Sequence, residues 1–192
     1  MCSSLGDGEV SLYASECNNF SIRCAFCGSE AVVQETVYEL PKIGKALLVS
    51  VHCAGCGYRR REVVPIEVRK RKRTYYLVES GEDLNAKVIR GNAASIEIPE
   101  LGISVTPGAA ATLTVTNIEG LLRMFQDAAK SIEVLEKKET PFVNQLEDII
   151  KNGGRFTLII DDPLGISSIE PPSDRCKLKL LIEEVEGELS LS

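Results

Sequence analysis

Four cysteines carry the clearest chemical signal in this sequence. They form two pairs with two residues between the members of each pair: Cys24 and Cys27, then Cys53 and Cys56. A tetrahedral zinc ion needs four soft ligands that converge on one point, and a C-x2-C turn places two thiolates on one side of it. Gly28 and Gly57 follow the pairs, and glycine adopts the positive φ of a sharp return turn without steric cost. The spacing therefore predicts a ribbon that holds one structural Zn²⁺ with four thiolates.

A redox dithiol and a chance repetition are the alternatives for these cysteines. A redox site of the thioredoxin type needs only one C-x2-C pair, so the second pair favours the metal. The segment between the pairs, residues 28–52, is long enough for two strands that bring the second pair beside the first.

Few other residues suggest catalysis. His52 is the only histidine, and it precedes Cys53 directly, so a Cys-His or Ser-His pair would have to be built beside the metal. Four thiolate ligands leave no open position for an activated water. Asp161 and Asp162 are a candidate cation site or acid–base pair, but neighbouring residues of a strand point to opposite sides. The sequence therefore predicts that the protein is not an enzyme.

A run of basic residues follows the second cysteine pair. Residues 59–73 contain eight basic side chains and two acidic ones, a local charge of +6 in a chain of net charge −6. This asymmetry makes the run a candidate partner-binding surface. Its basic members are Arg59, Arg60, Arg61, Arg69, Lys70, Arg71, Lys72 and Arg73. Two other interpretations remain open, a strand edge kept basic to prevent edge pairing and a nucleic-acid site that uses Tyr75 and Tyr76 for stacking.

The composition is that of an ordinary globular protein, with 44% hydrophobic and 26% charged residues in 192. The net charge argues against a chain that coats nucleic acid over its whole surface. Cys2, Cys17 and Cys176 are too few for a disulfide framework, so a reducing, cytoplasmic setting is expected, with Cys17 as a packed free thiol. No signal sequence and no membrane-spanning run is recognisable.

The elements that must position these residues follow from periodicity and turn signals. Residues 1–21 lack periodicity and predict an irregular lead-in, and residues 22–73 form the ribbon, with strands over 31–40, 45–52 and 62–68. Residues 74–192 predict a second domain with short strands up to 116, a strand over 156–160 and a last strand over 176–185.

Two amphipathic helices interrupt this second domain at about 117–152. Thr116 and Glu119 predict a capping box at the start of the first helix. Thr140 and Pro141 predict the start of the second helix, and Gly153 predicts its end. The fold class is therefore α+β, mainly β, with an antiparallel helical hairpin inserted between strands.

Several segments of the chain together resemble the ZPR-type zinc-finger family. They are the four-cysteine ribbon with Cys56-Gly57-Tyr58-Arg59, then Ile98-Pro99-Glu100-Leu101, Ile118-Glu119-Gly120-Leu121-Leu122, and the strand and turn over 156–163. The resemblance covers residues 22–170 and implies a zinc ribbon joined to a double-stranded β-helix with a helical hairpin. It looks like the archaeal form with a single module. The chain departs from the family pattern at Ala25, where proline is usual, and at Ser167-Ser168.

The resemblance implies binding to a protein. Family members are similar to chaperones for translation elongation factor one alpha, so that factor is the expected partner. The alternative is a nucleic-acid-binding zinc ribbon that uses the basic run over 59–73.

Overall fold

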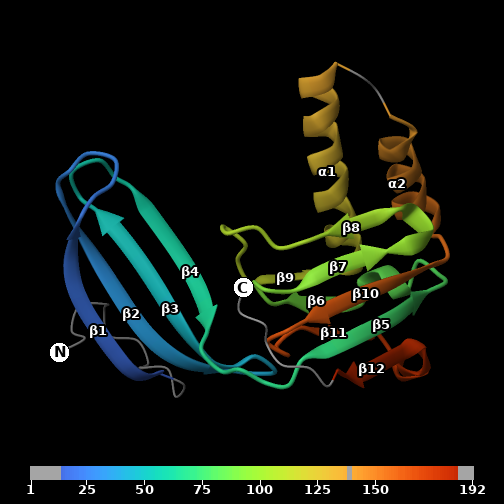
Figure 1. Ribbon diagram of the computed structural model, residues 1–192, viewed down its shortest axis with the longest axis horizontal. Helices are drawn as coiled ribbons and strands as arrows, with labels where there is room; N and C mark the ends of the chain where they lie inside the picture. Colours follow the sequence, from blue (N-terminus) through green and yellow to red (C-terminus); the bar gives the residue numbers. More distant parts are fainter. Residues whose placement is uncertain (1–13, 138–139, 186–192) are drawn as a thin grey trace. The chain divides into compact units, whose positions relative to one another are not determined.

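Strands dominate the described residues, 14–137 and 140–185, of the computed structural model (Figure 1). The chain divides into two units, Met1–Val68 and Arg69–Ser192. The predicted boundary between residues 73 and 74 falls a few residues after this division. The fold class is α+β and mainly β, as predicted. No helix in the described parts is long and apolar enough to cross a membrane.

The first unit contains one antiparallel sheet in which the strands follow each other in chain order. Its strands are β1 (Ala14–Arg23), β2 (Glu30–Leu40), β3 (Gly44–Cys53) and β4 (Arg59–Pro65). β2 pairs with β3 continuously from Ala31 opposite Cys53 to Leu40 opposite Gly44. This pairing brings the two cysteine pairs, which lie at strand ends, to the same end of the sheet.

The irregular lead-in predicted for residues 1–21 is wrong from residue 14 onward. Ala14–Arg23 form β1, which pairs with β2 along its length. The described side chains of β1 are exposed on both faces, for example Ser21 on one face and Ile22 on the other. A strand without a buried face has no reason to alternate polar and apolar residues, so periodicity could not reveal it. Residues 1–13 lie outside the described part of the chain.

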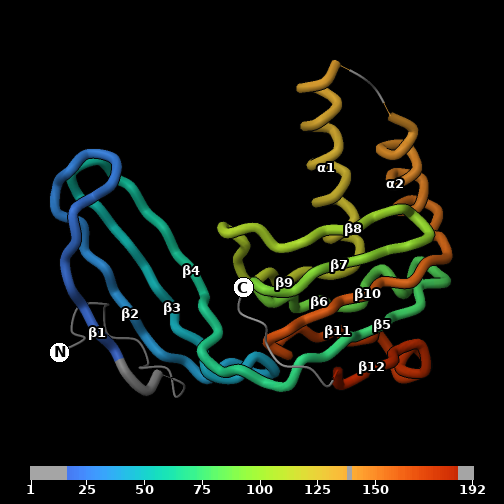
Figure 2. The backbone as a smooth tube through the Cα atoms, viewed as in Figure 1, coloured from blue at the N-terminus to red at the C-terminus, as the bar shows by residue number. Residues whose placement is uncertain are grey.

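The second unit is built from two antiparallel sheets with the hydrophobic core between them. The five-stranded sheet has the order β12-β5-β10-β7-β8, and the three-stranded sheet has the order β11-β6-β9. Figure 2 shows β10, which follows the helices in the chain, lying between the earlier strands β5 and β7. The strands are β5 (Lys72–Val78), β6 (Lys87–Arg90), β7 (Ser95–Ile98), β8 (Ile103–Val105), β9 (Thr114–Asn117), β10 (Phe156–Asp162), β11 (Ser168–Glu170) and β12 (Leu180–Glu184).

Two helices, α1 (Ile118–Glu136) and α2 (Pro141–Asn152), form the predicted hairpin beside these sheets (Figure 1). The first turns of α1 bury Leu121 and Leu122 in the same core as Leu158 of β10, and Leu146 of α2 joins them. Beyond Gln126 the described residues of α1 have no buried side chain. The outer half of the hairpin is therefore held by helix-to-helix contact and leaves an apolar surface exposed.

The ends of the helices confirm two of the predicted signals and correct a third. α2 begins at Pro141 after the N-cap Thr140, and it ends at Gly153, whose φ is 78°. The capping box at Thr116 is wrong, because the N-cap is Asn117, whose side chain accepts a 2.8 Å hydrogen bond from the backbone N–H of Gly120. Thr116 is instead paired within β9, where its backbone is held extended.

The predicted last strand over 176–185 is correct only in its second half. Asp174–Lys179 form a 3₁₀ helix, and β12 begins at Leu180. Lys179 ends this helix and donates a 2.8 Å hydrogen bond to Asp83, which is fully buried and also accepts from the hydroxyls of Tyr76 and Ser80. Burial alone would raise the pKa of Asp83, but the Lys179 ammonium and the other donors lower it below its usual range.

Candidate metal centre

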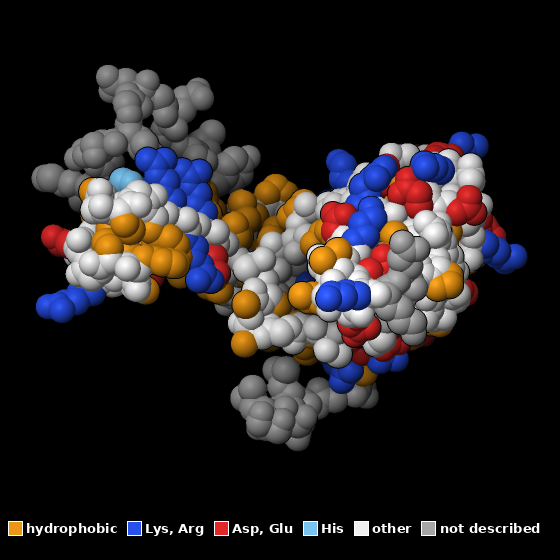
Figure 3. Space-filling model, turned by 90° about the horizontal axis from the view of Figure 1, so that it is seen from above, with side chains coloured by type: hydrophobic (Ala, Val, Ile, Leu, Met, Phe, Trp, Pro, Cys, Tyr) orange, Lys and Arg blue, Asp and Glu red, His pale blue; other side chains and the backbone are white. Residues whose placement is uncertain are grey.

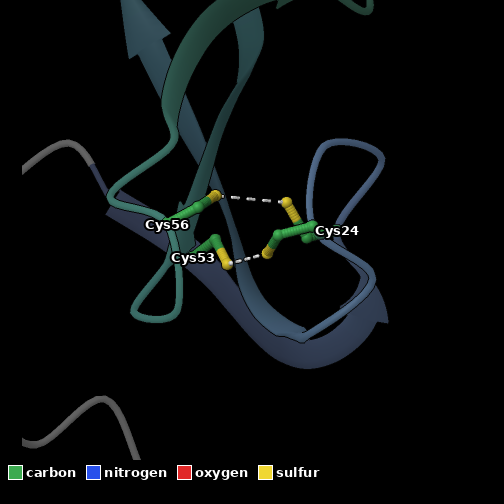
Figure 4. A group of neighbouring side chains, drawn as sticks. Cys24, Cys53 and Cys56 are labelled. Carbon is green, nitrogen blue, oxygen red and sulfur yellow. Dashed lines mark hydrogen bonds between the residues drawn. The ribbon is translucent and has the colours of Figure 1, made fainter.

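The four predicted zinc ligands meet at one end of the first sheet. Their sulfur atoms all lie within 4.8 Å of one another, with 3.7 Å between Cys24 and Cys56 and 3.5 Å between Cys27 and Cys53 (Figure 4). A tetrahedral ion with Zn–S bonds of about 2.3 Å requires S···S separations of about 3.8 Å. The observed cluster thus has the dimensions of a tetrathiolate zinc site.

The two cysteine turns have the same backbone geometry. In the first, the N–H of Gly28 donates to the carbonyl of Cys24, and the N–H of Cys24 donates to the carbonyl of Ser29. In the second, Gly57 donates to Cys53, and Cys53 donates to the carbonyl of the residue five positions later. Gly28 and Gly57 have φ of 72° and 75°, as predicted from their positions. The sequence repeat is therefore a structural repeat, and each turn supplies one buried and one exposed sulfur.

Contacts between the two turns fix their separation. A Cβ atom placed on Gly55 would lie 2.8 Å from Oγ and 2.9 Å from Cβ of Ser29, so only glycine allows this approach. On the outside, the ring of Phe26 packs on the ring of Tyr58 with centroids 4.6 Å apart. Phe26 remains 73% exposed. Sequence reasoning missed Ser29, Phe26 and Gly55 as parts of the site, because only their contacts across the turns reveal them.

The electrostatics of the cluster favour a bound cation. Hydrogen bonds from the side chain and backbone of Ser29 lower the pKa of Cys27 to about 6. Although the backbone N–H of Tyr58 favours the thiolate of Cys56, bonds to the other three thiols and burial raise the pKa of Cys56 to about 12. Cys27 is therefore inclined to the thiolate form, whereas Cys56 holds a proton that a divalent cation replaces when it binds. The donor set fits Zn²⁺, and these four positions leave no ligand site for water.

The basic run over 59–73 is divided between the two units of the chain. Arg71 and Arg73 both bind Asp161, at 2.9 and 2.5 Å, and Lys70 pairs with Glu184 at 3.1 Å. Lys72 is partly buried, and burial lowers its pKa. These residues belong to the second unit, whereas the first three arginines of the run belong to the first unit.

In β4 those first three arginines alternate between the two faces of the sheet. Arg60 pairs with Glu62 on one face, and Arg59 and Arg61 project from the other. All three are exposed. Arg69, another member of the run, is exposed in the second unit. Binding of a partner by the run stays a prediction.

The aspartates of the predicted acidic turn serve the fold. Asp161 is held between the two arginines described above, and Arg71 lowers its pKa most. Asp162 is fully buried and accepts bonds from the backbone N–H groups of Leu164 and Ile166 and from the hydroxyl of Ser167. Their side chains face opposite sides of the strand, as expected, so the structure does not bring them together as a cation site or an acid–base pair.

The remaining candidate residues from the sequence analysis take no part in the cluster of four cysteines. His52 is exposed on the face of β3 opposite Cys53. Tyr76 is fully buried and bound to Asp83, so it offers no stacking surface. Cys17 is disulfide-bonded, which corrects the expectation of a packed free thiol, and Cys176 is buried in the second unit.

Comparisons with known proteins agree with the predicted family. A family model described as the ZPR1 jelly-roll domain matches residues 82–188, which include the helical hairpin and every strand of the two sheets except β5. An uncharacterized ZPR1-like protein of Methanocaldococcus jannaschii is 33% identical over 154 residues, which cover 76% of this chain and 78% of that protein. A ZPR1-like protein of Pyrococcus horikoshii is 28% identical, with 87% of this chain and 79% of the relative covered.

A eukaryotic relative carries a name that states a role. The zinc finger chaperone zpr1 of Schizosaccharomyces pombe is 29% identical over 174 residues, which cover 84% of this chain but only 38% of that protein. The chain is thus similar to a part of a longer chaperone.

Proposed function

Because this chain belongs to the ZPR1 family, we propose that it is a zinc-dependent chaperone or assembly factor whose client is translation elongation factor one alpha. The observation that carries the proposal is the tetrathiolate cluster, which has the chemistry of a closed structural site. A closed site stabilises a binding surface and activates no water, so the proposed role is binding without catalysis. The name of the fission yeast relative supports a chaperone role. The proposed location is the cytoplasm, because the proposed client is a translation factor.

The proposed cofactor is one Zn²⁺ per chain, held by the thiolates of Cys24, Cys27, Cys53 and Cys56. When bound, the ion supplies four metal–sulfur bonds that join the two cysteine turns. Each cysteine turn is closed by its own backbone hydrogen bonds, which hold the two ligands of that turn in place for the ion. Zinc-finger peptides gain about 10–16 kcal/mol on binding the metal, as much as the net stability of a domain.

The helical hairpin offers an apolar contact for a folding client. Ile132, Val134 and Leu135 in the last turns of α1 are 54%, 78% and 82% exposed. Ile132 and Leu135 are three positions apart, so they lie on the same side of the helix and form an exposed apolar pair. A client that exposes apolar surface before folding is complete would cover them.

A refolding assay with the elongation factor of the same organism tests the proposal. The factor is denatured, diluted with or without this protein, and its recovery is measured by binding of a fluorescent GTP analogue. The wild-type chain should raise the recovered fraction, and Cys53→Ser should abolish the increase because it removes a metal ligand. Cys176→Ala is the matched control, since Cys176 is a buried cysteine outside the cluster.

Equal recovery with and without the wild-type chain would refute the client. Full activity of Cys53→Ser, with its zinc content shown to be lost, would refute the dependence on zinc.

A further inference from the structure

The four-stranded sheet separates its charges by face near the cysteine turns. Side chains alternate along each strand, and the pairing register carries each face across neighbouring strands. Arg59 lies opposite His52, which lies opposite Val32, and in the next row Arg61 lies opposite Ser50. The complete rows on this face are Arg59, His52, Val32 and Ser21, then Arg61, Ser50, Gln34 and Asn19.

A third arginine reaches the same face from the other edge of the sheet. Arg23 is the last residue of β1 and lies two positions after Ser21 on that strand, so its side chain projects from the same face. Glu30, opposite Arg23, is the only acidic residue among the described, paired positions of this face. Figure 3 shows basic side chains gathered next to the histidine.

These arginines are available to a partner. Arg23, Arg59 and Arg61 are exposed, and no ion pair links any of them to another side chain within residues 14–137 and 140–185. Arg60, their neighbour on the opposite face, is paired with Glu62. The strand thus neutralises the arginine of one face and leaves the two arginines of the other face unneutralised.

We infer that this basic face, defined by Arg23, Arg59 and Arg61, binds an acidic, extended segment of a partner protein. The inference rests on the proposed function in taking that partner to be the client. Guanidinium groups bind carboxylates in a bidentate manner, and complementary charge speeds association. Val32, 51% exposed between the two edges, adds an apolar contact for a side chain between the acids.

An acidic peptide fits this face better than a nucleic acid does. Proteins that bind single strands combine basic grooves with aromatic side chains on which the bases stack. The two rows beside the arginines contain no Phe, Tyr or Trp. The chain as a whole has a net charge of −6, which repels an extended polyanion beyond the face itself.

Three consecutive arginines of β4 provide a matched test in the full chain. The probe is a fluorescein-labelled peptide of glutamates with a central leucine, and its binding is measured by anisotropy at low and moderate salt. Arg59→Gln and Arg61→Gln should each weaken binding about 3- to 10-fold, the loss expected for one charge-assisted contact. Arg60→Gln, on the opposite face, should change binding less than about twofold.

Equal losses in all three variants would overturn the inference, because general electrostatic attraction does not distinguish the faces. Absence of peptide binding would overturn it as well. An oligouridine strand that binds more tightly than the peptide, with the same dependence on Arg59 and Arg61, would assign the face to nucleic acid instead.

The elongation factor separates this inference from the proposed function. If the factor binds and refolds equally well with wild type and with the Arg59→Gln, Arg61→Gln double variant, the face is not the client site, although the proposed function stands. If the peptide binds through these arginines but the factor is neither bound nor refolded, the proposed client is wrong and the basic face stands.

Discussion

Substitution of Gly55 by alanine should weaken zinc binding by forcing the two cysteine turns apart. The new Cβ would lie 2.8 and 2.9 Å from the side-chain atoms of Ser29, whereas carbon contacts are favourable at about 3.5–4.0 Å. Residue 55 lies between two of the ligands, so the strain falls directly on the metal site. Overpacking of this kind costs about 1–3 kcal/mol. Since each 1.4 kcal/mol is a factor of ten, the zinc Kd should rise about 5- to 150-fold.

Competition with a chromophoric chelator measures this change, and a double-mutant cycle identifies its cause. Ser29→Gly removes both atoms that the new methyl group meets, so it should relieve most of the loss in the Gly55→Ala background. Gly57→Ala is the matched control: it forces alanine to a φ of 75° but meets no atom within 4 Å, so Ser29→Gly should not rescue it. Unchanged affinity in Gly55→Ala, or equal rescue of both alanine variants, would refute the close-contact explanation.

Three further predictions concern the metal and the second unit. Metal analysis should give one zinc per wild-type chain and none for Cys53→Ser; full zinc content in that variant would exclude the assigned ligands. Stability to urea should fall as the pH drops below about 4. The pKa of Asp83 is lower in the folded protein than in the unfolded chain, where it is about 3.9, so the ionised carboxylate stabilises the fold above that pH. This stabilisation is lost as the carboxylate is protonated. Asp83→Asn should cost about 1–3 kcal/mol at pH 7, since it removes a charge-assisted hydrogen bond from Lys179, which keeps only the weaker partner Glu79 at 3.7 Å, and it should flatten this acid dependence; an unchanged slope would contradict the assignment. Asn117→Ala should lower the thermal midpoint by removing the cap of α1, at about 1 kcal/mol, whereas Thr116→Ala should not remove that cap.

The cluster of four cysteines was the most predictable part of the described chain because its signals are local. Cys24 and Cys27 lie within one turn, and the following glycine takes the positive φ that the turn requires. The start of α2 at Pro141 and its end at Gly153 were predictable for the same reason. Each of these features is decided by residues only a few positions apart.

Features decided by distant residues could not be predicted in this way. β1 exists because β2 offers it a pairing edge, and its own side chains carry no buried pattern. The N-cap of α1 is Asn117 and not the predicted Thr116, because Thr116 of β9 is paired with Val88 of β6. Both residues are good caps by type, so only the length of the preceding strand could decide between them.

The basic run illustrates why a count of charges does not describe a surface. Its +6 charge is local in sequence, but Asp161, about ninety residues later, engages two of its arginines. Strand periodicity then places Arg60 on one face of β4 and leaves Arg59 on the other. Arg23, which belongs to no charge run, joins Arg59 because three successive strand pairings carry one face across the sheet. The register of the sheet, more than the composition of the run, therefore determines which charges a partner can meet.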